Sequence, residues 1–365
     1  MLSLVTILAA CGDSTTPPAT SSPTSTSEPT PTPTPDPNAT ATPTPSTHSL
    51  LYRELGSVSD TIWRFDPTNP DDRQNIATID HSEGVGIRAS VSPQRDAVAY
   101  ITLPAGRLDE ETESQAFVLP IGGSPQMLAD GVDLLSTPLW SPDGGSLYLR
   151  RNSAAAISIV KVDMQGGEES ELVSVNRNDV FGLFPIGLSN DSQTLYYAQI
   201  ASDLSTSFLA YGLTSGGSSL LVQASPQIAR DYDLSADGSR IAFISSGRAF
   251  IADLDTAIVT AVESDLLSGS EQRQPVWRPN GSLALGQLPL DNEPSPAVVI
   301  DPATGQGSTL ASPDSGFDAP LEWSPDGQFL AVQTISGTSA QLTVANQDQR
   351  LSIAEGPDFL SIGWI

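Results

Sequence analysis

The sequence is poor in cysteine and histidine, and each shortage argues against a class of site. Its one cysteine, Cys11, lies near the N-terminus, so the body of the chain has neither a disulfide nor a thiol for catalysis or zinc binding. The two histidines, His48 and His81, are too few for a multi-histidine zinc site and argue against a histidine-based catalytic triad. Glycine-rich phosphate loops and the Gly-x-Ser-x-Gly nucleophile motif are also missing.

Basic residues are scarce as well. The chain has 16 of them against 43 acidic residues, a formal net charge of -27. Only three acids precede Arg53, the first basic residue, so the rest of the chain carries -24. Such a surface repels nucleic acid, because binding requires Lys and Arg to neutralise phosphates. We expect no nucleic-acid partner. The charge is explained by solvation of an exposed protein, with a cation or a basic partner as the alternative.

The N-terminus has the features of an export signal. Residues 2–10 are apolar but far shorter than the roughly 20 residues of a membrane-spanning helix. The run ends in Leu-Ala-Ala-Cys-Gly at 8–12, which resembles the bacterial lipobox, although no Lys or Arg precedes it. The resemblance implies cleavage after residue 10 and lipidation of Cys11. We therefore expect an exported protein, lipid-anchored to the outer face of the bacterial cell membrane or periplasmic.

A stalk follows the cysteine. Residues 14–47 consist mainly of Thr, Ser, Pro and Ala, which provide too little apolar surface to offset the entropy of the chain. The predicted organisation is a signal peptide over 1–10, a lipidated cysteine and disordered linker over 11–48, and a folded body over 49–365.

The body contains repeats, which predict its fold. Trp-Ser-Pro-Asp-Gly occurs at 140–144 and again at 323–327, and weaker copies have their anchor residues at positions 91, 188, 234 and 277. The anchors are 43 to 49 residues apart, the length of one four-stranded propeller blade. Proline presets φ and glycine accepts positive φ, so the motif predicts a tight turn between the two innermost strands. The tryptophan is expected to pack between blades.

The two ends of the chain supply a seventh blade. Residues 50–79 offer three strands without an innermost one, and residues 359–365 resemble an innermost strand that ends at its tryptophan. Pairing these segments would remove free sheet edges. The sequence therefore predicts an all-β fold, a seven-bladed β-propeller closed by the C-terminal strand.

These repeats resemble the WD40-like repeats of the TolB propeller family over residues 50–365. The resemblance implies a periplasmic or surface propeller that binds other proteins. The separate N-terminal α/β domain of TolB has no counterpart here, because the stalk stands in its place.

Acidic loops are one candidate ligand site. Asp109, Glu110 and Glu111 lie in a predicted loop between the second and third strands of a blade. Other acids are expected on the same face, in loops that hold Asp291, Glu293, Asp265, Glu271, Asp314 and Asp318. Carboxylates in this number are suited to Ca²⁺ or to a glycosidase carboxylate pair, with solvated loop charge as the alternative.

Three arginines are the second candidate. Arg88, Arg230 and Arg273 each lie three or four residues before a repeat anchor, in or near the strand that lines the channel. Together they are suited to a carboxylate or phosphate of a ligand. The alternative is pairing with neighbouring acids such as Asp231 and Glu271.

The sequence thus favours a monomeric, non-enzymatic binding module for a protein or peptide. The alternative is a carboxylate- or calcium-dependent hydrolase of an extracellular polymer. No cofactor is expected, Ca²⁺ being the one candidate.

Overall fold

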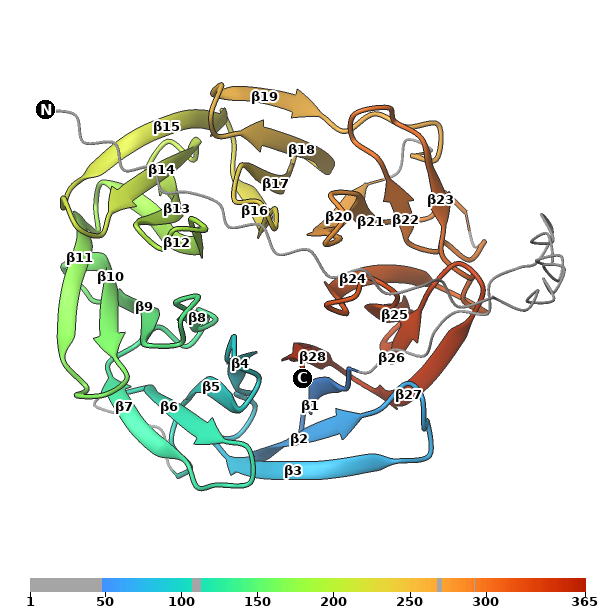
Figure 1. Cartoon of the computed structure of the whole chain (residues 1–365), viewed down its shortest axis with the longest axis horizontal. Helices are drawn as coiled ribbons and strands as arrows, with labels where there is room; N and C mark the ends of the chain where they lie inside the picture. The colour runs from blue at the N-terminus through green and yellow to red at the C-terminus, as the bar shows by residue number, and fades with distance from the viewer. Residues whose placement is uncertain (1–47, 107–112, 268–270, 292) are drawn as a thin grey trace, which may run out of the picture. The chain divides into compact units, whose positions relative to one another are not determined.

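A computed structural model describes residues 48–106, 113–267, 271–291 and 293–365, and these residues contain no helix. They form seven four-stranded antiparallel sheets, arranged as blades around a central opening (Figure 1). The prediction of an all-β, seven-bladed propeller is confirmed.

Each blade is described from its innermost to its outermost strand. Blade one contains β28 (Phe359–Trp364), β1 (Leu50–Glu54), β2 (Ser59–Phe65) and β3 (Arg73–Asp80). Blade two contains β4 (Arg88–Val91), β5 (Ala97–Thr102), β6 (Gln115–Pro120) and β7 (Gln126–Asp130). Blade three contains β8 (Leu139–Trp140), β9 (Ser146–Asn152), β10 (Ala156–Asp163) and β11 (Glu169–Asn176). Blade four contains β12 (Val180–Leu188), β13 (Thr194–Ala201), β14 (Thr206–Gly212) and β15 (Ser218–Ser225).

The remaining blades follow the same order. Blade five contains β16 (Ala229–Leu234), β17 (Arg240–Ser245), β18 (Arg248–Asp253) and β19 (Ile258–Ala261). Blade six contains β20 (Gln272–Trp277), β21 (Leu283–Gln287), β22 (Val298–Ile300) and β23 (Gly307–Thr309). Blade seven contains β24 (Phe317–Trp323), β25 (Leu330–Ser336), β26 (Ser339–Ala345) and β27 (Arg350–Gly356).

The Ser-Pro-Asp-Gly turn has a physical reason for its composition. In blade three, Gly144 has a φ of 68° and donates its backbone N–H to the carbonyl oxygen of Ser141, at 2.8 Å. The Ser141 hydroxyl donates to the Asp143 carboxylate and accepts the backbone N–H of Ser146. The same Ser-to-Asp bond occurs in other blades and helps to lower the pKa of Asp237 to about 2. The repeated motif is therefore a turn device that joins the two innermost strands.

The hydrophobic core is divided among the seams between blades. Seven clusters of buried side chains occur among the described residues, and each draws its members from two neighbouring blades. Trp140, Trp277 and Trp364 are buried in such seams, and each donates its indole N–H to a backbone carbonyl of the preceding blade, at 3.1 to 3.4 Å. The predicted packing role of the tryptophans is confirmed.

The ring closes between the first and last strands, as predicted. β28 pairs antiparallel with β1, with Trp364 opposite Leu50 and Phe359 opposite Glu54. Ser49 and Ile365 exchange two backbone hydrogen bonds of 2.8 Å. Blade one therefore takes one strand from the C-terminal end of the chain and three from its N-terminal side.

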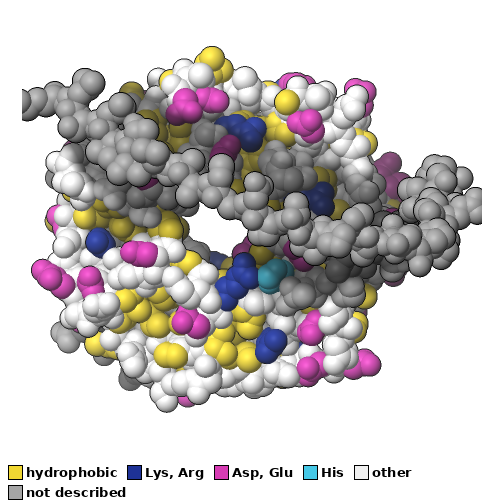
Figure 2. All heavy atoms as spheres, in the orientation of Figure 1, with side chains coloured by type: hydrophobic (Ala, Val, Ile, Leu, Met, Phe, Trp, Pro, Cys, Tyr) yellow, Lys and Arg dark blue, Asp and Glu magenta, His cyan; other side chains and the backbone are white. Residues whose placement is uncertain are grey.

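The propeller has two distinct ends. We call the end with the turns between innermost and second strands the near end, because residue 48 lies there: His48 Nδ1 is 3.0 Å from Arg95 Nη1 in such a turn. The far end is where the innermost strands begin, next to the connections between blades. Figure 2 shows the opening from one end, with acidic side chains spread over the ring. No helix long and apolar enough to cross a membrane occurs among the described residues.

Candidate functional site at the far end

The three predicted arginines lie at the far mouth of the channel. Arg88 is the first residue of β4, and Arg230 and Arg273 are the second residues of β16 and β20. β16 and β20 are neighbours, and β4 lies across the opening from them (Figure 1). The structure thus brings together two of the three arginines and leaves Arg88 on the opposite wall. Their role in ligand binding stays a prediction.

The two neighbouring arginines are linked by one carboxylate. Glu271 Oε1 lies 3.1 Å from Arg230 Nη2 and 3.2 Å from Arg273 Nη2, and Arg230 also pairs with Asp231. This is the pairing that the sequence left open as an alternative. Because these side chains are exposed to solvent, such pairs contribute at most about 1 kcal/mol each. Arg88, by contrast, forms no ion pair with any residue that the structure describes.

The backbone of this wall is strained. Asp231 and Gln274 have φ values of 56° and 46°, each at a bulge where the register with the next strand shifts. A left-handed conformation costs a residue with a side chain about 1–2 kcal/mol, and bulges often occur beside functional sites. Gln274 Oε1 is also buried without a hydrogen-bond partner among the described residues. The strain and the unpaired atom single out the wall formed by blades five and six.

Deeper in the same wall, Asp233 has an altered proton affinity. Its pKa is raised to about 7, mainly because the surrounding protein reduces solvation of its carboxylate and, to a smaller extent, because of the negative charge of Glu322. A hydrogen bond of 2.6 Å from the Trp277 backbone N–H acts in the opposite direction. Asp233 is partly exposed to the channel, yet protein surrounds it on most sides.

Glu322, near the end of β24, has the same character. Burial raises its pKa to about 7, against the hydrogen bond that the Ser361 hydroxyl donates to Oε2 at 2.9 Å. Neither Glu322 nor Asp233 pairs with a cation among the described residues. These two carboxylates have the most strongly altered pKa values among the described acids of the channel. Groups that titrate near neutral pH are suited to proton exchange.

Sequence reasoning missed both acids, although the repeat contains a signal for them. Asp233 and Glu322 occupy the position just before the repeat anchor. The same position in other blades holds small or apolar residues, such as Leu139, Gly187 and Val276. An acid at a position that is otherwise uncharged is the feature that would have identified them.

The predicted location of one acid is wrong, and three other predicted acids lie outside the described residues. Asp318 was expected in a loop, but it lies in β24, fully buried, where it accepts hydrogen bonds from Thr334 at 2.8 Å and from Arg350. Its carboxylate is neutralised inside the protein and is not available to a ligand. The acidic loop residues Asp109, Glu110 and Glu111 lie outside the described residues, as does Cys11.

The described part of the chain contains no group of three or more His, Cys, Asp or Glu side chains placed to hold a metal ion. His81 is buried, with Nδ1 2.8 Å from the Ser82 carbonyl oxygen and Nε2 3.1 Å from the Asp60 carboxylate. Its two contacts account for both ring nitrogens, so its role is structural. Of the acids predicted as Ca²⁺ ligands, Asp109, Glu110 and Glu111 lie outside the described residues, whereas others, such as Asp291 and Asp314, lie within them, and Ca²⁺ binding stays a prediction.

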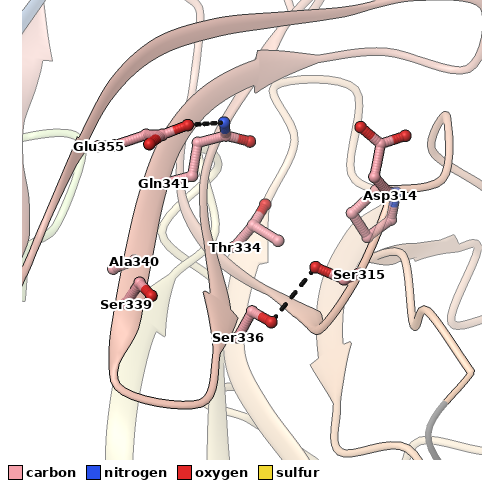
Figure 3. A pocket seen from close by; sticks show the side chains of 9 residues that line it. Asp314, Ser315, Thr334, Ser336, Ser339, Ala340, Gln341 and Glu355 are labelled. Atoms are coloured by element: carbon pink, nitrogen blue, oxygen red, sulfur yellow. Dashed lines mark hydrogen bonds between the residues drawn. The ribbon is translucent and has the colours of Figure 1, made fainter.

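A cleft of about 300 Å³ lies at the far end of blade seven. Figure 3 shows its side chains, which are almost all polar, with Ser315 bonded to Ser336 at 3.2 Å and Gln341 bonded to Glu355 at 3.2 Å. No aromatic side chain lines it, and the buried Thr334 on its wall is bonded to Asp318 and Arg350. Its polar groups are largely satisfied by one another, which makes it a weaker candidate than the channel mouth.

Large apolar side chains gather at the far end. Nine are exposed among the described residues, and six of these lie in far-end loops or at the start of an innermost strand: Val58, Leu135, Phe181, Leu204, Ile228 and Leu290. The other three, Met127, Leu220 and Ile258, lie on outermost strands, and none lies in a near-end turn. Exposed apolar groups of this kind are typical of interaction surfaces.

No protein-family model matches the sequence, and no curated protein matches it. Solved structures do match, and they place the chain among the β-propellers. TolB from Acinetobacter baumannii has 16% sequence identity and a TM-score of 0.54, over 89% of this chain and 68% of that protein. The TolB-like propeller fold expected from the repeats is thereby confirmed.

Enzymes share this fold too. The periplasmic gluconolactonase of Pseudomonas aeruginosa has 15% identity and a TM-score of 0.57, over 87% of this chain and 99% of that one. An oligogalacturonate lyase in complex with manganese has 14% identity and a TM-score of 0.58, over 86% and 85%. At such identities the similarity establishes the fold alone, because one fold supports many functions.

Proposed function

We propose that the chain is an exported lipoprotein, anchored through Cys11, whose propeller binds a protein or peptide at its far end without catalysing a reaction. The observation that carries the proposal is the gathering of exposed apolar side chains at that end. Protein interfaces take much of their binding energy from such side chains once a partner covers them.

The location of residue 48 supports the proposal that the partner binds at the far end. His48 and Ser49 lie at the near end, so the lipidated linker proposed for residues 11–48 joins the propeller there. The far end is then the one turned away from the attachment point. A tether at one end and an apolar surface at the other suit a protein that reaches for a partner.

Photo-crosslinking tests which end binds. We expect p-benzoylphenylalanine at Leu135 or Leu290, both 74% exposed at the far end, to form an adduct with the same partner in the native envelope. The control positions Pro142 and Ala236 are exposed in near-end turns between innermost and second strands. They are expected to give at least fivefold less adduct. Equal yields from the two ends, or no adduct from any far-end position, would refute the proposed function.

The anchor has a separate test. Cys11→Ser is expected to abolish incorporation of an alkyne-labelled palmitate and to move the protein from the membrane fraction to the soluble one. The reason is that each buried methylene of an acyl chain contributes about 0.8 kcal/mol to membrane attachment. Label retained by the serine variant would contradict lipidation at this residue.

A second candidate function is hydrolysis or lyase chemistry on an extracellular polymer. The observation in its favour is the pair Asp233 and Glu322, whose pKa values near 7 are suited to general acid and base roles. The gluconolactonase and lyase propellers share the fold. Turnover of gluconolactone or oligogalacturonate that disappears in the Asp233→Asn, Glu322→Gln variant would favour this candidate over binding alone.

A further inference from the structure

Three of the exposed apolar side chains belong to one blade end. Phe181 lies near the start of β12, Leu204 in the loop between β13 and β14, and Ile228 in the connection that leads from β15 to β16. Their exposed fractions are 57%, 42% and 38%. We call these three residues the blade-four patch.

Backbone pairing brings Phe181 close to the loop of Leu204. Val180, just before Phe181, is the strand partner of Ala201, three residues before Leu204. The loop is closed by a hydrogen bond of 2.9 Å from Leu204 N to the Ala201 carbonyl oxygen. Phe181 and Leu204 therefore extend from adjoining segments at one edge of the blade.

Thr206 connects the loop of Leu204 to Ile228. Its hydroxyl donates to the Gln227 carbonyl oxygen at 2.9 Å and accepts the Ala229 backbone N–H at 2.9 Å. These bonds hold the residues on both sides of Ile228 against a threonine two positions from Leu204. The segments that present the three side chains are thus linked by the pairing of Val180 with Ala201 and by the two hydrogen bonds of Thr206.

Leu204 is an unusual residue for its position. Its φ is 70°, in the left-handed region that favours glycine or asparagine and disfavours a bulky side chain. Because the side chain is also exposed, it does not contribute to the core. A strained backbone that presents an apolar side chain to solvent points to a contact outside the chain.

Two carboxylates neighbour the patch residues in the chain. Asp179 lies two residues before Phe181 and is exposed, and Asp203 directly precedes Leu204. The Ser205 hydroxyl and backbone N–H bond to the Asp203 carboxylate and hold its pKa below the usual value, so Asp203 stays ionised. Neither aspartate forms an ion pair with a described residue, and Arg177 is the one basic residue of the three connecting segments.

We infer that the blade-four patch is the docking site for a protein segment that presents large apolar side chains together with basic residues. The inference rests on the proposed function and adds the chemistry of the partner. Apolar anchors would cover Phe181, Leu204 and Ile228, while basic groups would meet the neighbouring aspartates. The charge of -24 beyond residue 52 attracts a basic segment and repels a second copy of this chain.

A designed peptide tests this chemistry with the full propeller. The probe is a fluorescein-labelled 14-residue peptide of leucine and lysine, measured by fluorescence anisotropy. We expect Phe181→Ser combined with Ile228→Ser to weaken binding at least tenfold. The control, Met127→Ser combined with Leu220→Ser, removes two apolar side chains that are at least as exposed as Ile228 from outermost strands, and it should change binding less than twofold. Raising the salt concentration from 50 to 300 mM should also weaken binding.

The variant Leu204→Gly distinguishes a loss of peptide binding from a loss of stability. Glycine accepts the left-handed backbone without strain, so we expect a melting temperature equal to or above that of the parent. The same change removes an anchor and should weaken peptide binding at least threefold. A variant that keeps its stability and loses affinity has lost a contact with the peptide.

Four outcomes would overturn the inference: equal loss in the outermost-strand control, equal binding of a leucine–glutamate peptide, unchanged binding by Leu204→Gly, or a dimer in sedimentation that the patch variant abolishes. The proposed function fails separately. If crosslinking from positions 135 and 290 persists undiminished in the patch variant, the docking site is wrong and binding at the far end stands.

Discussion

Deletion of residues 359–365 is expected to abolish the cooperative unfolding transition of the propeller. Phe359, Ile362 and Trp364 are buried in the two seams that flank blade one. Burial of a large apolar side chain contributes about 1.5–3 kcal/mol, so the three together contribute roughly 5–9 kcal/mol. That sum is comparable to the whole stability of a typical domain, about 5–15 kcal/mol.

The deletion would also leave a free edge on β1. Leu50 to Glu54 would lose the hydrogen bonds now made with β28, and an unpaired edge promotes aggregation. Thermal unfolding followed by circular dichroism, together with size-exclusion chromatography, measures both effects. A truncated protein that unfolds cooperatively at the parent's temperature would contradict the closure mechanism.

A transplanted strand provides the control. Residues 359–365 can be placed before Ser49 through the turn sequence 141–145, because Ile365 and Ser49 already exchange hydrogen bonds of 2.8 Å. With the C-terminal copy removed, this permuted chain has the same strands with a different connection. It is expected to unfold within a few degrees of the parent, which shows that the strand itself, and not its position in the sequence, stabilises the ring.

Replacing Asp233 by Asn and Glu322 by Gln is expected to make the propeller more stable at pH 8 by about 3 kcal/mol. Both carboxyl groups have pKa values of about 7 in the folded protein, above their ordinary values of 3.8 and 4.5. The folded state therefore binds these protons more tightly than the unfolded state. Their stabilising effect is complete below about pH 4 and is lost as the pH rises through 7.

The expected size follows from the proton affinities. A tenfold change in proton affinity corresponds to about 1.4 kcal/mol, and channel water screens both charges, which reduces the combined effect to about 3 kcal/mol. The amide side chains keep the acceptors that the Trp277 N–H and the Ser361 hydroxyl use, and they remove the charge. Urea unfolding of parent and variant at pH 5, 6, 7 and 8 measures the difference.

Asp191→Asn with Asp203→Asn is the matched control for this titration. Both aspartates are exposed, and serine hydroxyl groups hold their pKa values below the usual range. They are ionised throughout pH 5 to 8, so this pair should leave the pH dependence of stability unchanged over that interval. Parallel pH profiles for the parent and the Asp233, Glu322 variant would show that the channel carboxylates do not titrate near neutral pH.

The sequence predicted the positions of the arginines in the candidate site but not their pairing with acids. The spacing of Arg88, Arg230 and Arg273 from their anchors placed them correctly at one channel mouth, because anchors fix positions along innermost strands that all run in one direction. Whether they were paired depended on Glu271, which approaches Arg230 from the next blade. Contacts across a seam join residues about 40 positions apart, and no local pattern specifies them.

The acids illustrate the same limit. Asp318 was expected among loop carboxylates, yet it is buried with Arg350 because β24 begins earlier than the repeat suggested. Asp233 and Glu322 look like ordinary acids in the sequence. Their proton affinities arise from the ring around them, which lowers solvation of both carboxylates, and for Asp233 also from the charge of Glu322. Such effects require the relative positions of different blades.

The sequence by itself determined the number of blades, the turn in each repeat and the closure of the ring. These features depend on local chemistry, namely the Pro-Asp-Gly turn and a strand spacing that recurs every 43 to 49 residues. The tertiary structure alone decided which arginines are neutralised, which carboxylates are perturbed and that the apolar side chains gather at the far end. Those properties depend on the closing of seven sheets into a ring, which places the corresponding loops of distant repeats on one surface.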